Sequence, residues 1–432
     1  MRALLVTHGS RGDVQPFVAL ARGLSAAGHD VSIIGPRRTF QIARSAGIPY
    51  VPVADGPLEL LNDPVIVKVN QSSRPGPVLA MRWFLRNRPR YVQVLEELIA
   101  AVRAQPRPDV ILFQPWVPAH HIAESLDVPA VPVCLQPGWV PTPDFPNPLL
   151  ATRIPRALNK ASYASSKLTV RLLYGSTIDR VRRQELGLLS RRGRHNMLRS
   201  PDGKPVTVLQ PFSPHVLPET RHYPPTTHTT GFWRLPTPRG WSAPPRLARF
   251  LEAGRPPVYI GFGSLTGSNP LRLREAVIAA VRQAGVRAVV ATGWGGVAGP
   301  GQEESSTPEE IFFLDEVPHD QLFPHMAAVV HHGGAGTTAA ALAAGRPQVV
   351  CPFGFDQPFW ARRMRACGVA PPPLPQHRLT AERLAVAVDR AVRDTGMAQR
   401  AEHLGVLTRA QDGVAEAVEV LENMVARARG VS

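Results

Sequence analysis

The chain of 432 residues carries 49 Lys and Arg against 33 Asp and Glu, a formal net charge of +16. Its hydrophobic content of 44% is that of a folded globular protein and excludes a largely disordered chain; at about 150 residues per domain, its length indicates two or three domains, and we take two. The charge favours anionic partners or reflects a bias toward arginine, but the densest basic stretch, 180–194, has no aromatic side chains to stack on bases, which argues against a nucleic-acid role.

The cysteine positions and the first residues of the chain indicate the cellular compartment. Cys134, Cys351 and Cys367 lie far apart with no CxxC pair, which fits a reducing compartment. The apolar run Ala3–Val6 is too short for the core of a signal peptide, and no later segment offers about 18 uninterrupted apolar residues. We therefore expect a cytoplasmic protein, and its basic surface leaves peripheral contact with a membrane open.

The chain begins with the pattern of a strand, a helix and a second strand. The apolar run Ala3–Thr7 predicts a buried strand, and apolar residues at i, i+3, i+4 and i+7 predict a helix from about Pro16 to Gly28. A second strand is predicted over 30–35. Such a βαβ unit places parallel strands under covering helices, and the short apolar runs 110–113 and 130–134 continue the pattern.

Two proline-rich stretches follow. The first, 136–148, carries Trp139 and Phe145, as a binding loop or a rigid connector would. The composition of the chain changes after Pro224, and the second proline-rich stretch runs from Arg234 to Pro245; we take 234–247 as an interdomain linker.

Beyond the linker, short apolar runs predict the strands of a second parallel sheet, over 258–262, 288–291, 311–314, 328–330 and 348–351. We therefore expect an N-terminal α/β domain over 1–233 and a C-terminal α/β domain over 248–396. A last amphipathic stretch predicts a helical tail over 397–432, formed by one long helix.

The segment after the predicted strand 328–330 contains residues typical of a ligand-binding turn. A predicted strand ends in His331-His332, and Gly333-Gly334-Ala335-Gly336-Thr337-Thr338 opens a helix. Glycines let a backbone approach a ligand, and unpaired amides at a helix start favour a diphosphate; His332 would add a donor beside the leaving group. Glycine turns also occur without any phosphate, so a purely structural turn stays open.

A second polar pair follows the next strand. Asp356 and Gln357 come shortly after the run that ends at Cys351. Ligands of open α/β sheets bind at the carboxyl ends of strands, so this pair suits hydrogen bonds to sugar hydroxyls.

In its order of motifs, the segment 329–357 resembles the donor-binding signature of the UDP-glycosyltransferase superfamily, closest to bacterial antibiotic glycosyltransferases and sterol glucosyltransferases. The segment Gly9–Pro16 resembles the opening of the same family. The resemblance implies the α/β GT-B fold, two facing doubly wound, Rossmann-like parallel-sheet domains with a C-terminal helix. It also implies an inverting transfer of a hexose from a UDP- or TDP-linked donor to a hydroxyl of a hydrophobic natural product, sterol or lipid.

Residue roles follow from this resemblance. Asp13 stands where relatives place the catalytic base; the alternative is that it only caps the first helix. The donor-binding positions implied are Ser10, Gly12, Ser264, Trp294, Val317, His332, Gly334, Ala335, Gly336, Thr337, Asp356 and Gln357, although Trp294 is equally an ordinary core residue. Trp139 and Phe145 would contact the acceptor.

Some positions depart from the plant members of the family. Glu316 stands where they have Trp, and Ala340 replaces their ribose-binding Glu, which leaves UDP or TDP open. No Asp-x-Asp pair occurs, and the neighbouring His331 and His332 would point to opposite faces of a strand, so we expect no metal and no cofactor besides the donor.

Other functions stay open at this point. A nucleotide-sugar epimerase would share the architecture, a non-catalytic partner protein would bind the donor without turnover, and an anion-binding interaction protein would account for the charge alone. A nicotinamide enzyme is disfavoured because the first loop lacks the GxGxxG spacing. The sequence identifies neither the acceptor nor the oligomeric state.

Overall fold

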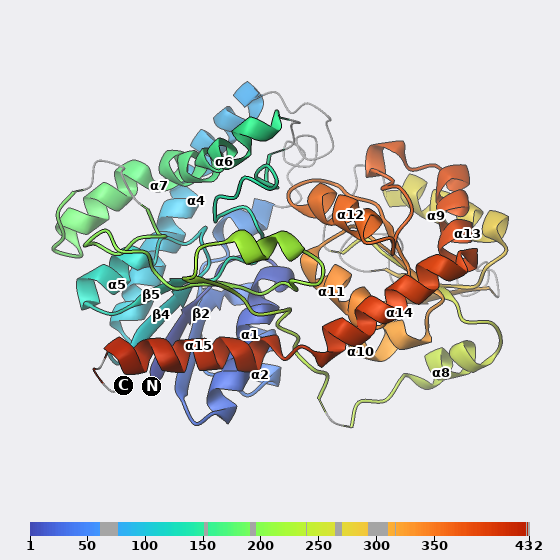
Figure 1. The fold of residues 1–432 in the computed structure, drawn as a ribbon, viewed down its shortest axis with the longest axis horizontal. Coiled ribbons are helices and arrows are strands. Elements are labelled where there is room, and N and C mark those ends of the chain that lie inside the picture. The colour runs from blue at the N-terminus through green and yellow to red at the C-terminus, as the bar shows by residue number, and fades with distance from the viewer. Residues whose placement is uncertain are drawn as a thin grey trace. The chain divides into compact units, whose positions relative to one another are not determined.

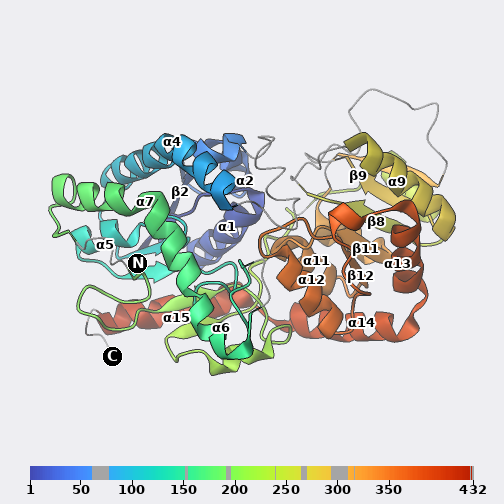
Figure 2. The same cartoon turned by 90° about the horizontal axis from the view of Figure 1, so that it is seen from above.

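The computed structural model describes residues 1–60, 77–150, 154–190, 196–238, 240–263, 270–292, 310–315, 317–428 and 430. The chain forms two compact units, each of which is described by itself (Figures 1 and 2). The first takes in Met1–Leu60, Met81–Leu235 and the chain from Gln411 onward, and the second takes in Pro236–Ala410 together with the described residues 77–80.

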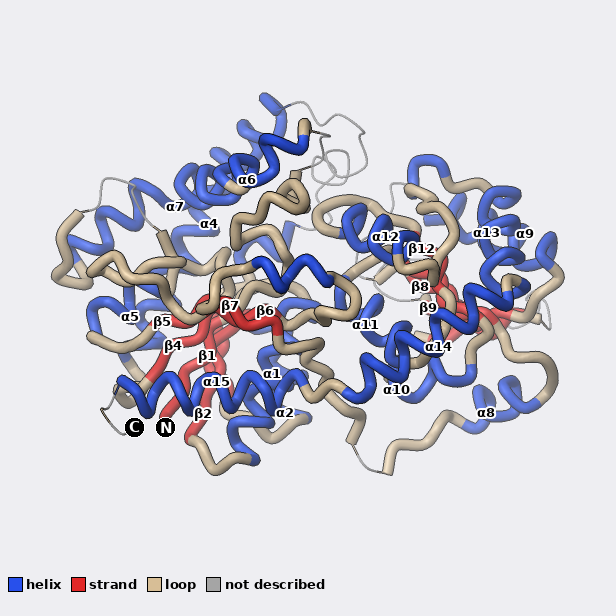
Figure 3. The backbone as a smooth tube through the Cα atoms, viewed as in Figure 1, coloured by secondary structure: helices blue, strands red, loops and turns tan. Residues whose placement is uncertain are grey.

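A parallel sheet of five described strands forms the centre of the first unit, in the order β3-β2-β1-β4-β5; Figure 3 labels β1, β2, β4 and β5 of this sheet. The strands are β1 (Arg2–Val6), β2 (Asp30–Pro36), β3 (Tyr50–Val53), β4 (Val110–Phe113) and β5 (Ala130–Pro132). The predicted βαβ start is therefore confirmed. A small parallel pair, β6 (Val208–Gln210) and β7 (Thr227–Thr229), forms a second sheet, which a parallel bridge between Leu209 and Val133 joins to the residue after β5.

Helices cover both faces of the first sheet. Alternate residues of β1 point to opposite faces, and the apolar side chains on each face are buried under helices. Leu5 packs with Phe17 of α1 (Arg11–Ala26), on the face that α15 (Gly413–Ala428) also covers. Leu4 packs with Leu98 and Ile178 on the other face, which α4 (Pro77–Arg103) and α7 (Ala164–Gln184) cover. The remaining described helices of this unit are α2 (Phe40–Ser45), α5 (His120–Leu126) and α6 (Asn159–Ser162).

The first helix begins earlier than the sequence predicted. Helix α1 starts at Arg11 with Ser10 as its N-cap, and Pro16 lies inside it. Asp13 supplies the reason, because its carboxylate accepts a hydrogen bond from the Ser10 amide, as the third residue of a capping box does. The prediction of a start near Pro16 was wrong because it relied on proline and overlooked this cap.

The C-terminal stretch is two helices, so the prediction of one long helix was wrong. Helix α14 (Thr395–Ala410) packs on α11 in the second unit, and α15 packs on α1 in the first. The break falls at Asp412, whose Oδ1 accepts from the Ala415 amide at 3.0 Å and so caps α15. At Gly413 a Cβ would lie 2.6 Å from the carbonyl oxygen of Gly231, so only glycine allows this close approach.

The second unit repeats the strand order of the first. Its sheet of five described strands is parallel in the order β10-β9-β8-β11-β12. The strands are β8 (Val258–Gly261), β9 (Ala288–Ala291), β10 (Ile311–Leu314), β11 (Ala328–His331) and β12 (Gln348–Val350). Each of the five apolar runs predicted beyond the linker therefore forms a strand.

Two apolar layers enclose this second sheet. Val258 and Ile260 of β8 pack toward α9 (Pro270–Ala284) and α13 (Ala381–Arg393), whereas Tyr259 packs on the opposite face with α8 (Pro245–Glu252), α10 (His319–Leu322) and α11 (Ala335–Ala343). Helix α12 (Gln357–Ala366) follows β12. Across the described ranges of the whole chain, none of the helices combines the length and apolar character needed to cross a membrane.

Candidate active site

Each sheet has one point where the strand order reverses. In the first unit it lies between β1 and β4, and in the second between β8 and β11. At such a point the crossovers on either side leave in opposite directions, which opens a crevice at the carboxyl ends of the two strands. Asp13 follows β1, and the turn from His332 to Gly334 follows β11. The two segments that the sequence singled out therefore lie at the switch points of their own sheets.

Asp13 is held in place by three hydrogen bonds at the start of α1. Its Oδ2 accepts from the Ser10 amide at 2.8 Å and from Ser10 Oγ at 3.1 Å, while its Oδ1 accepts from Gln114 Nε2 at 2.8 Å. These bonds favour the charged carboxylate, but burial outweighs them and raises the pKa of Asp13 above its ordinary value. The side chain is only partly exposed. Asp13 caps the helix with one oxygen and keeps acceptor capacity on the other, so the capping and catalytic roles are compatible.

The sequence did not identify Gln114, which orients Asp13. Gln114 follows β4 directly and is buried. Its Oε1 accepts from the His8 amide at 3.1 Å and from Thr7 Oγ1 at 3.3 Å, so its NH2 group is directed at Asp13. The available signal was a polar residue at the end of an apolar run. The backbone of Gly9 lies so close to the Asp13 carboxylate that a Cβ at Gly9 would overlap it.

The two other donor positions predicted in this unit lie on the same turn. Ser10 is the N-cap and is already bonded to Asp13, while Gly12 is exposed in the first turn of α1. His8 lies beside them, and its Nε2 is 3.1 Å from the carbonyl oxygen of Ala54. Burial lowers the pKa of His8, so this imidazole is neutral and adds no charge to the site.

The predicted acceptor contacts, Trp139 and Phe145, are both buried in the loop that follows β5. The ring of Trp139 packs edge-on against Trp116, with centroids 4.7 Å apart. Among the described residues its buried Nε1 has no hydrogen-bond partner. The Phe145 carbonyl accepts from the Tyr163 hydroxyl at 3.4 Å, which ties the loop to the start of α7. Their contact with an acceptor stays a prediction.

In the second unit, the start of α11 offers backbone amides to a ligand. Its N-cap is Gly334, which has no side chain to bond them, and Ala335, Gly336 and Thr337 form the first turn. Thr338 is buried and donates its hydroxyl to the Gly334 carbonyl at 2.9 Å, so Thr337 is the hydroxyl that remains for a ligand. An uncapped helix start of this kind attracts anionic groups.

The two neighbouring histidines have separate tasks. His331 is fully buried, its Nε2 lies 2.8 Å from Gln348 Oε1, and its Nδ1 accepts from the Gly333 amide at 3.0 Å. Burial lowers the pKa of His331 to about 3, so a neutral ring braces the glycine turn from inside the sheet. His332 follows the last residue of β11, and its ring plane lies at 86° to that of His331.

His332 lies between two glycines. A Cβ at Gly263 would lie 2.7 Å from its Cε1, and a Cβ at Gly334 would lie 2.5 Å from its Nε2. Burial lowers the pKa of His332 to about 4, and its buried Nδ1 has no partner within the described part of the chain. A neutral imidazole keeps one N–H, so His332 can donate to an oxygen bound at the glycine turn. No group of three or more His, Cys, Asp or Glu side chains among the described residues could hold a metal ion.

The side chains of the two predicted sugar contacts already make some hydrogen bonds to neighbouring residues. Gln357 is buried, and its Oε1 accepts from the amides of Phe353 at 2.8 Å and Gly354 at 3.4 Å, which leaves its NH2 group for a ligand. Asp356 is the N-cap of α12, and its Oδ2 accepts from Trp360 Nε1 at 3.0 Å. Between them and the strand, Phe355 has a φ of 55°, a left-handed conformation that the surrounding bonds must maintain.

The remaining predicted donor positions divide into two groups. Val317 is buried among the core residues behind β8 and β11, so only its backbone can reach a base. Ser264, Trp294 and Glu316 lie outside the described residues. Ala340, which replaces the Glu of the plant pattern, lies half-buried within α11.

Known proteins match this chain over almost its whole length. Residues 3–100 match the glycosyltransferase family 28 N-terminal domain, and residues 297–424 match the erythromycin biosynthesis protein CIII-like C-terminal domain. O-mycaminosyltylonolide 6-deoxyallosyltransferase from Streptomyces fradiae is 35% identical over 443 residues, which cover 98% of this chain and 97% of that protein. The chain belongs to the UDP-glycosyltransferase superfamily.

Two further comparisons concern a longer relative and a solved structure. Sterol 3-beta-glucosyltransferase UGT80A2 from Arabidopsis thaliana is 32% identical over 97% of this chain, which spans 65% of that longer protein. The solved structure of the glycosyltransferase VinC in complex with dTDP matches with a TM-score of 0.66 at 21% identity, over 99% of this chain and 100% of that one. The two α/β units with parallel sheets and a C-terminal helix thus have the predicted GT-B fold.

Proposed function

We propose that this glycosyltransferase moves a hexose from a UDP- or TDP-linked donor to a hydroxyl of a hydrophobic small molecule. In this proposal the second unit binds the donor and the first binds the acceptor, with the chain passing between domains over 234–247. The names of the relatives support an acceptor of this kind, since one acts on a sterol and another on O-mycaminosyltylonolide. The dTDP in the VinC complex supports a nucleotide diphosphate donor.

The observation that carries the proposal is the pairing of chemistries at the two switch points. One holds a carboxylate whose pKa burial has raised, and the other holds an uncapped helix start beside a neutral histidine N–H. A raised pKa makes Asp13 a better proton acceptor near neutrality. Amides at the start of α11 and the N–H of His332 suit the negative charge of a departing diphosphate.

The reaction we propose is a single displacement. The acceptor oxygen forms a bond to the anomeric carbon while the bond from that carbon to the diphosphate oxygen breaks. The hydroxyl proton passes to Asp13, and the nucleoside diphosphate leaves with the electron pair of the broken bond. Attack from the side opposite the diphosphate inverts the anomeric configuration. Asp356 and the NH2 group of Gln357 hold the sugar hydroxyls in this scheme.

We also propose that the transfer needs no divalent metal. The sequence has no Asp-x-Asp pair to hold one, and in this proposal the amides of α11 and the N–H of His332 compensate the charge of the diphosphate. Turnover should therefore be the same in excess EDTA as in added Mg²⁺. A rate that fell on chelation and returned with Mg²⁺ would contradict this part of the proposal. A cytoplasmic location, proposed because the three cysteines lie far apart in the sequence, would fit a donor made inside the cell.

Product analysis with and without acceptor separates the proposal from its rivals. The purified protein would be incubated with UDP-glucose or TDP-sugars, with a panel of hydrophobic aglycones or with none. Acceptor-dependent glycoside formation, with inverted anomeric configuration by NMR, is the expected result. Free nucleotide with rearranged sugar in the absence of acceptor would indicate an epimerase, and donor binding without any turnover would indicate a non-catalytic partner protein.

A further inference from the structure

Helix α7 exposes large apolar side chains in a regular pattern. Leu168 and Leu172 are 53% and 52% exposed and lie one helical turn apart, on the same side of the helix. Leu158, in the short turn before α6, is 51% exposed. Single exposed leucines are ordinary, but a row of them on neighbouring elements indicates a surface that another phase or molecule covers.

Cationic residues flank these leucines. Lys167 and Arg171 are exposed next to Leu168 and Leu172 along α7, and Lys160 is exposed on α6. We call Leu158, Lys160, Lys167, Leu168, Arg171 and Leu172 together the docking stripe. A helix face of leucines bordered by Lys and Arg is typical of segments that lie in the interface of an anionic membrane.

The surrounding sequence contains no acidic residue that would oppose such a surface. From Phe145 to Ile178 there is no Asp or Glu, and two of the four lysines of the chain fall in this interval. The acids that border it are Asp144 and Asp179. Asp144 lies 3.0 Å from His222 Nδ1, an ion pair when that ring is protonated. The positive charge of the docking stripe therefore has no local counter-charge along the chain.

The opposite face of α7 anchors the docking stripe to a rigid base. Tyr174, Ile178 and Val181 are buried against α4 and the sheet. Near the end of the helix, the buried Arg182 makes two hydrogen bonds to the Glu124 carboxylate, at 2.6 and 2.9 Å. Because α7 already satisfies its core contacts on that side, the exposed leucines are not unpaired core residues of this unit.

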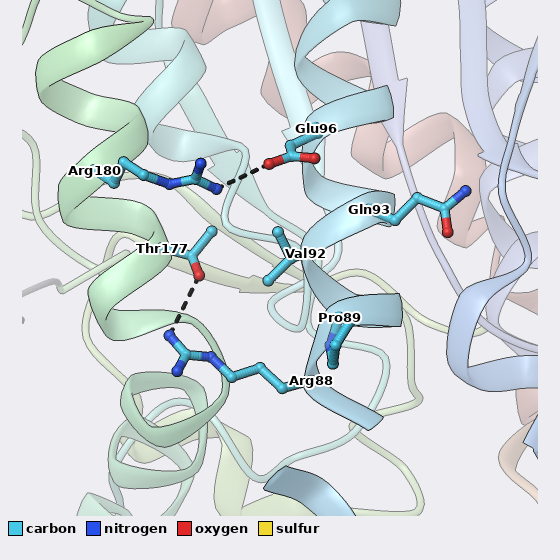
Figure 4. A pocket seen from close by; sticks show the side chains of 7 residues that line it. All are labelled: Arg88, Pro89, Val92, Gln93, Glu96, Thr177 and Arg180. Atoms are coloured by element: carbon cyan, nitrogen blue, oxygen red, sulfur yellow. Dashed lines mark hydrogen bonds and ion pairs between the residues drawn. The ribbon is translucent and has the colours of Figure 1, made fainter. Parts of the chain in front are cut away.

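A groove that includes charged side chains lies beside α7 (Figure 4). It lies between α4 and α7 with a volume of about 530 Å³, and Arg88, Thr177 and Arg180 are among the residues that line it. The guanidinium of Arg88 donates to Ser176 Oγ, one turn after Leu172, and Arg180 pairs with Glu96 at 2.8 Å. Arg88 therefore extends the cationic border of the leucine row to the edge of this groove.

We propose that the docking stripe seats the first unit on an anionic lipid bilayer. The leucines would enter the boundary between headgroups and acyl chains, and the lysines and arginines would lie at the lipid phosphates. The surface fits a bilayer better than an acidic protein because, in α7, each exposed leucine follows an exposed cationic residue, so apolar and cationic side chains lie next to each other. This inference does not depend on which acceptor the enzyme uses.

Vesicle binding of the full chain tests the proposal. Wild type should co-sediment with vesicles of phosphatidylcholine and phosphatidylglycerol, and bind vesicles of phosphatidylcholine alone much more weakly. The Leu168→Gln/Leu172→Gln variant should bind the anionic vesicles at least about tenfold more weakly. Lys167→Gln/Arg171→Gln should bind them about thirtyfold more weakly, since each cation near the surface contributes about a factor of five.

Matched controls lie on α13 in the second unit. Val386 is 70% exposed there, and Arg383 and Arg390 are exposed on the same helix. Val386→Gln and Arg383→Gln/Arg390→Gln should bind as wild type does, and all variants should keep the wild-type circular dichroism and transfer to a water-soluble acceptor.

Three outcomes would overturn the proposal. Wild type could fail to bind the anionic vesicles, or the docking-stripe variants could bind as tightly as the α13 variants. In the third, light scattering without lipid would detect a dimer that the leucine variant abolishes, which would assign the surface to a second copy of the chain.

Discussion

The two switch points of this molecule are alike in topology and differ in chemistry. At the end of β1, a carboxylate is surrounded by side chains, and burial and hydrogen bonds together determine its pKa. At the end of β11, the ligand groups are the backbone amides of α11 and a histidine whose pKa burial has lowered to about 4. Proton affinity can be adjusted by the surroundings of a side chain, whereas amide dipoles are the same at every pH. In the proposed function, one fold thus provides a proton acceptor in one unit and a fixed anion site in the other.

The largest effect should come from removing the base. Asp13→Asn keeps an oxygen to accept from the Ser10 amide but cannot take up a proton, so we expect kcat to fall about 10²–10⁴-fold. Donor affinity, measured by calorimetric titration with UDP and TDP, should stay close to wild type. Asp30→Asn, a change at an exposed carboxylate in the same unit, is the control. Turnover near the wild-type rate would remove Asp13 from the chemistry and leave it as a helix cap.

The second largest effect should come from the N–H beside the diphosphate. His332→Leu fills the space between Gly263 and Gly334 without a donor, and we expect kcat to fall about 10²-fold, as for loss of one donor to a developing charge. His332→Gln retains an N–H and should recover part of the rate. The measurement is the steady-state rate at saturating donor.

His331 provides the contrast for that experiment. It contacts Gln348 and the Gly333 amide from inside the sheet. Gln348→Leu should therefore lower thermal stability but leave unchanged the ratio of kcat with a UDP-linked donor to kcat with a TDP-linked donor.

For His332 itself, equal rates for wild type and His332→Leu would contradict the prediction. They would show that the backbone amides alone stabilise the charge of the departing diphosphate.

A smaller effect should appear in the pH profile when Gln114 is changed. Gln114→Leu removes a hydrogen bond that favours the charged form of Asp13, so the pKa of Asp13 should rise further. The acid limb of kcat/KM should then move to higher pH by about one unit. Gln114→Glu should move it in the same direction, because a second carboxylate opposes ionisation of the first. A loss of rate with an unchanged profile would mean that Gln114 only supports the fold.

The strands were predictable because their signal is local. Each apolar run is a few residues long and ends at a polar, glycine or proline residue, and all five runs of the second unit form strands in one parallel sheet. The start of α1 was misjudged although its signal was present, since Ser10 followed three residues later by Asp13 is a capping pattern. The break before α15 was also visible in Asp412-Gly413, but the amphipathic pattern continues on both sides of it.

Gln114 could not be found in this way. A single glutamine after a strand belongs to no motif, and what makes it matter is that β4 pairs with β1 in register, Phe113 beside Val6. That pairing brings residues 101 positions apart within 2.8 Å of each other. The separation of tasks between His331 and His332 has the same origin, because it depends on Gln348 of the neighbouring strand.

The smallest effect that we predict concerns stability. Because burial raises the pKa of Asp13, the folded protein holds this proton to a higher pH than the unfolded chain does, and stability falls as pH rises from the ordinary value of 3.8 through the raised one. Asp13→Asn removes this cost, so its Tm at neutral pH should exceed that of wild type by about 2–4 °C if the cost is about 1 kcal/mol.

The difference should close in acid, where Asp13 is protonated in both states, and Asp30→Asn should show no such crossover. Thermal denaturation of the three proteins across pH provides the comparison. A lower Tm for Asp13→Asn at neutral pH would mean that the bonds from Ser10 and Gln114 stabilise the carboxylate by more than its burial costs. The charged carboxylate of Asp13 would then stabilise the folded protein. The first switch point would no longer differ from the second by holding a base that lowers stability.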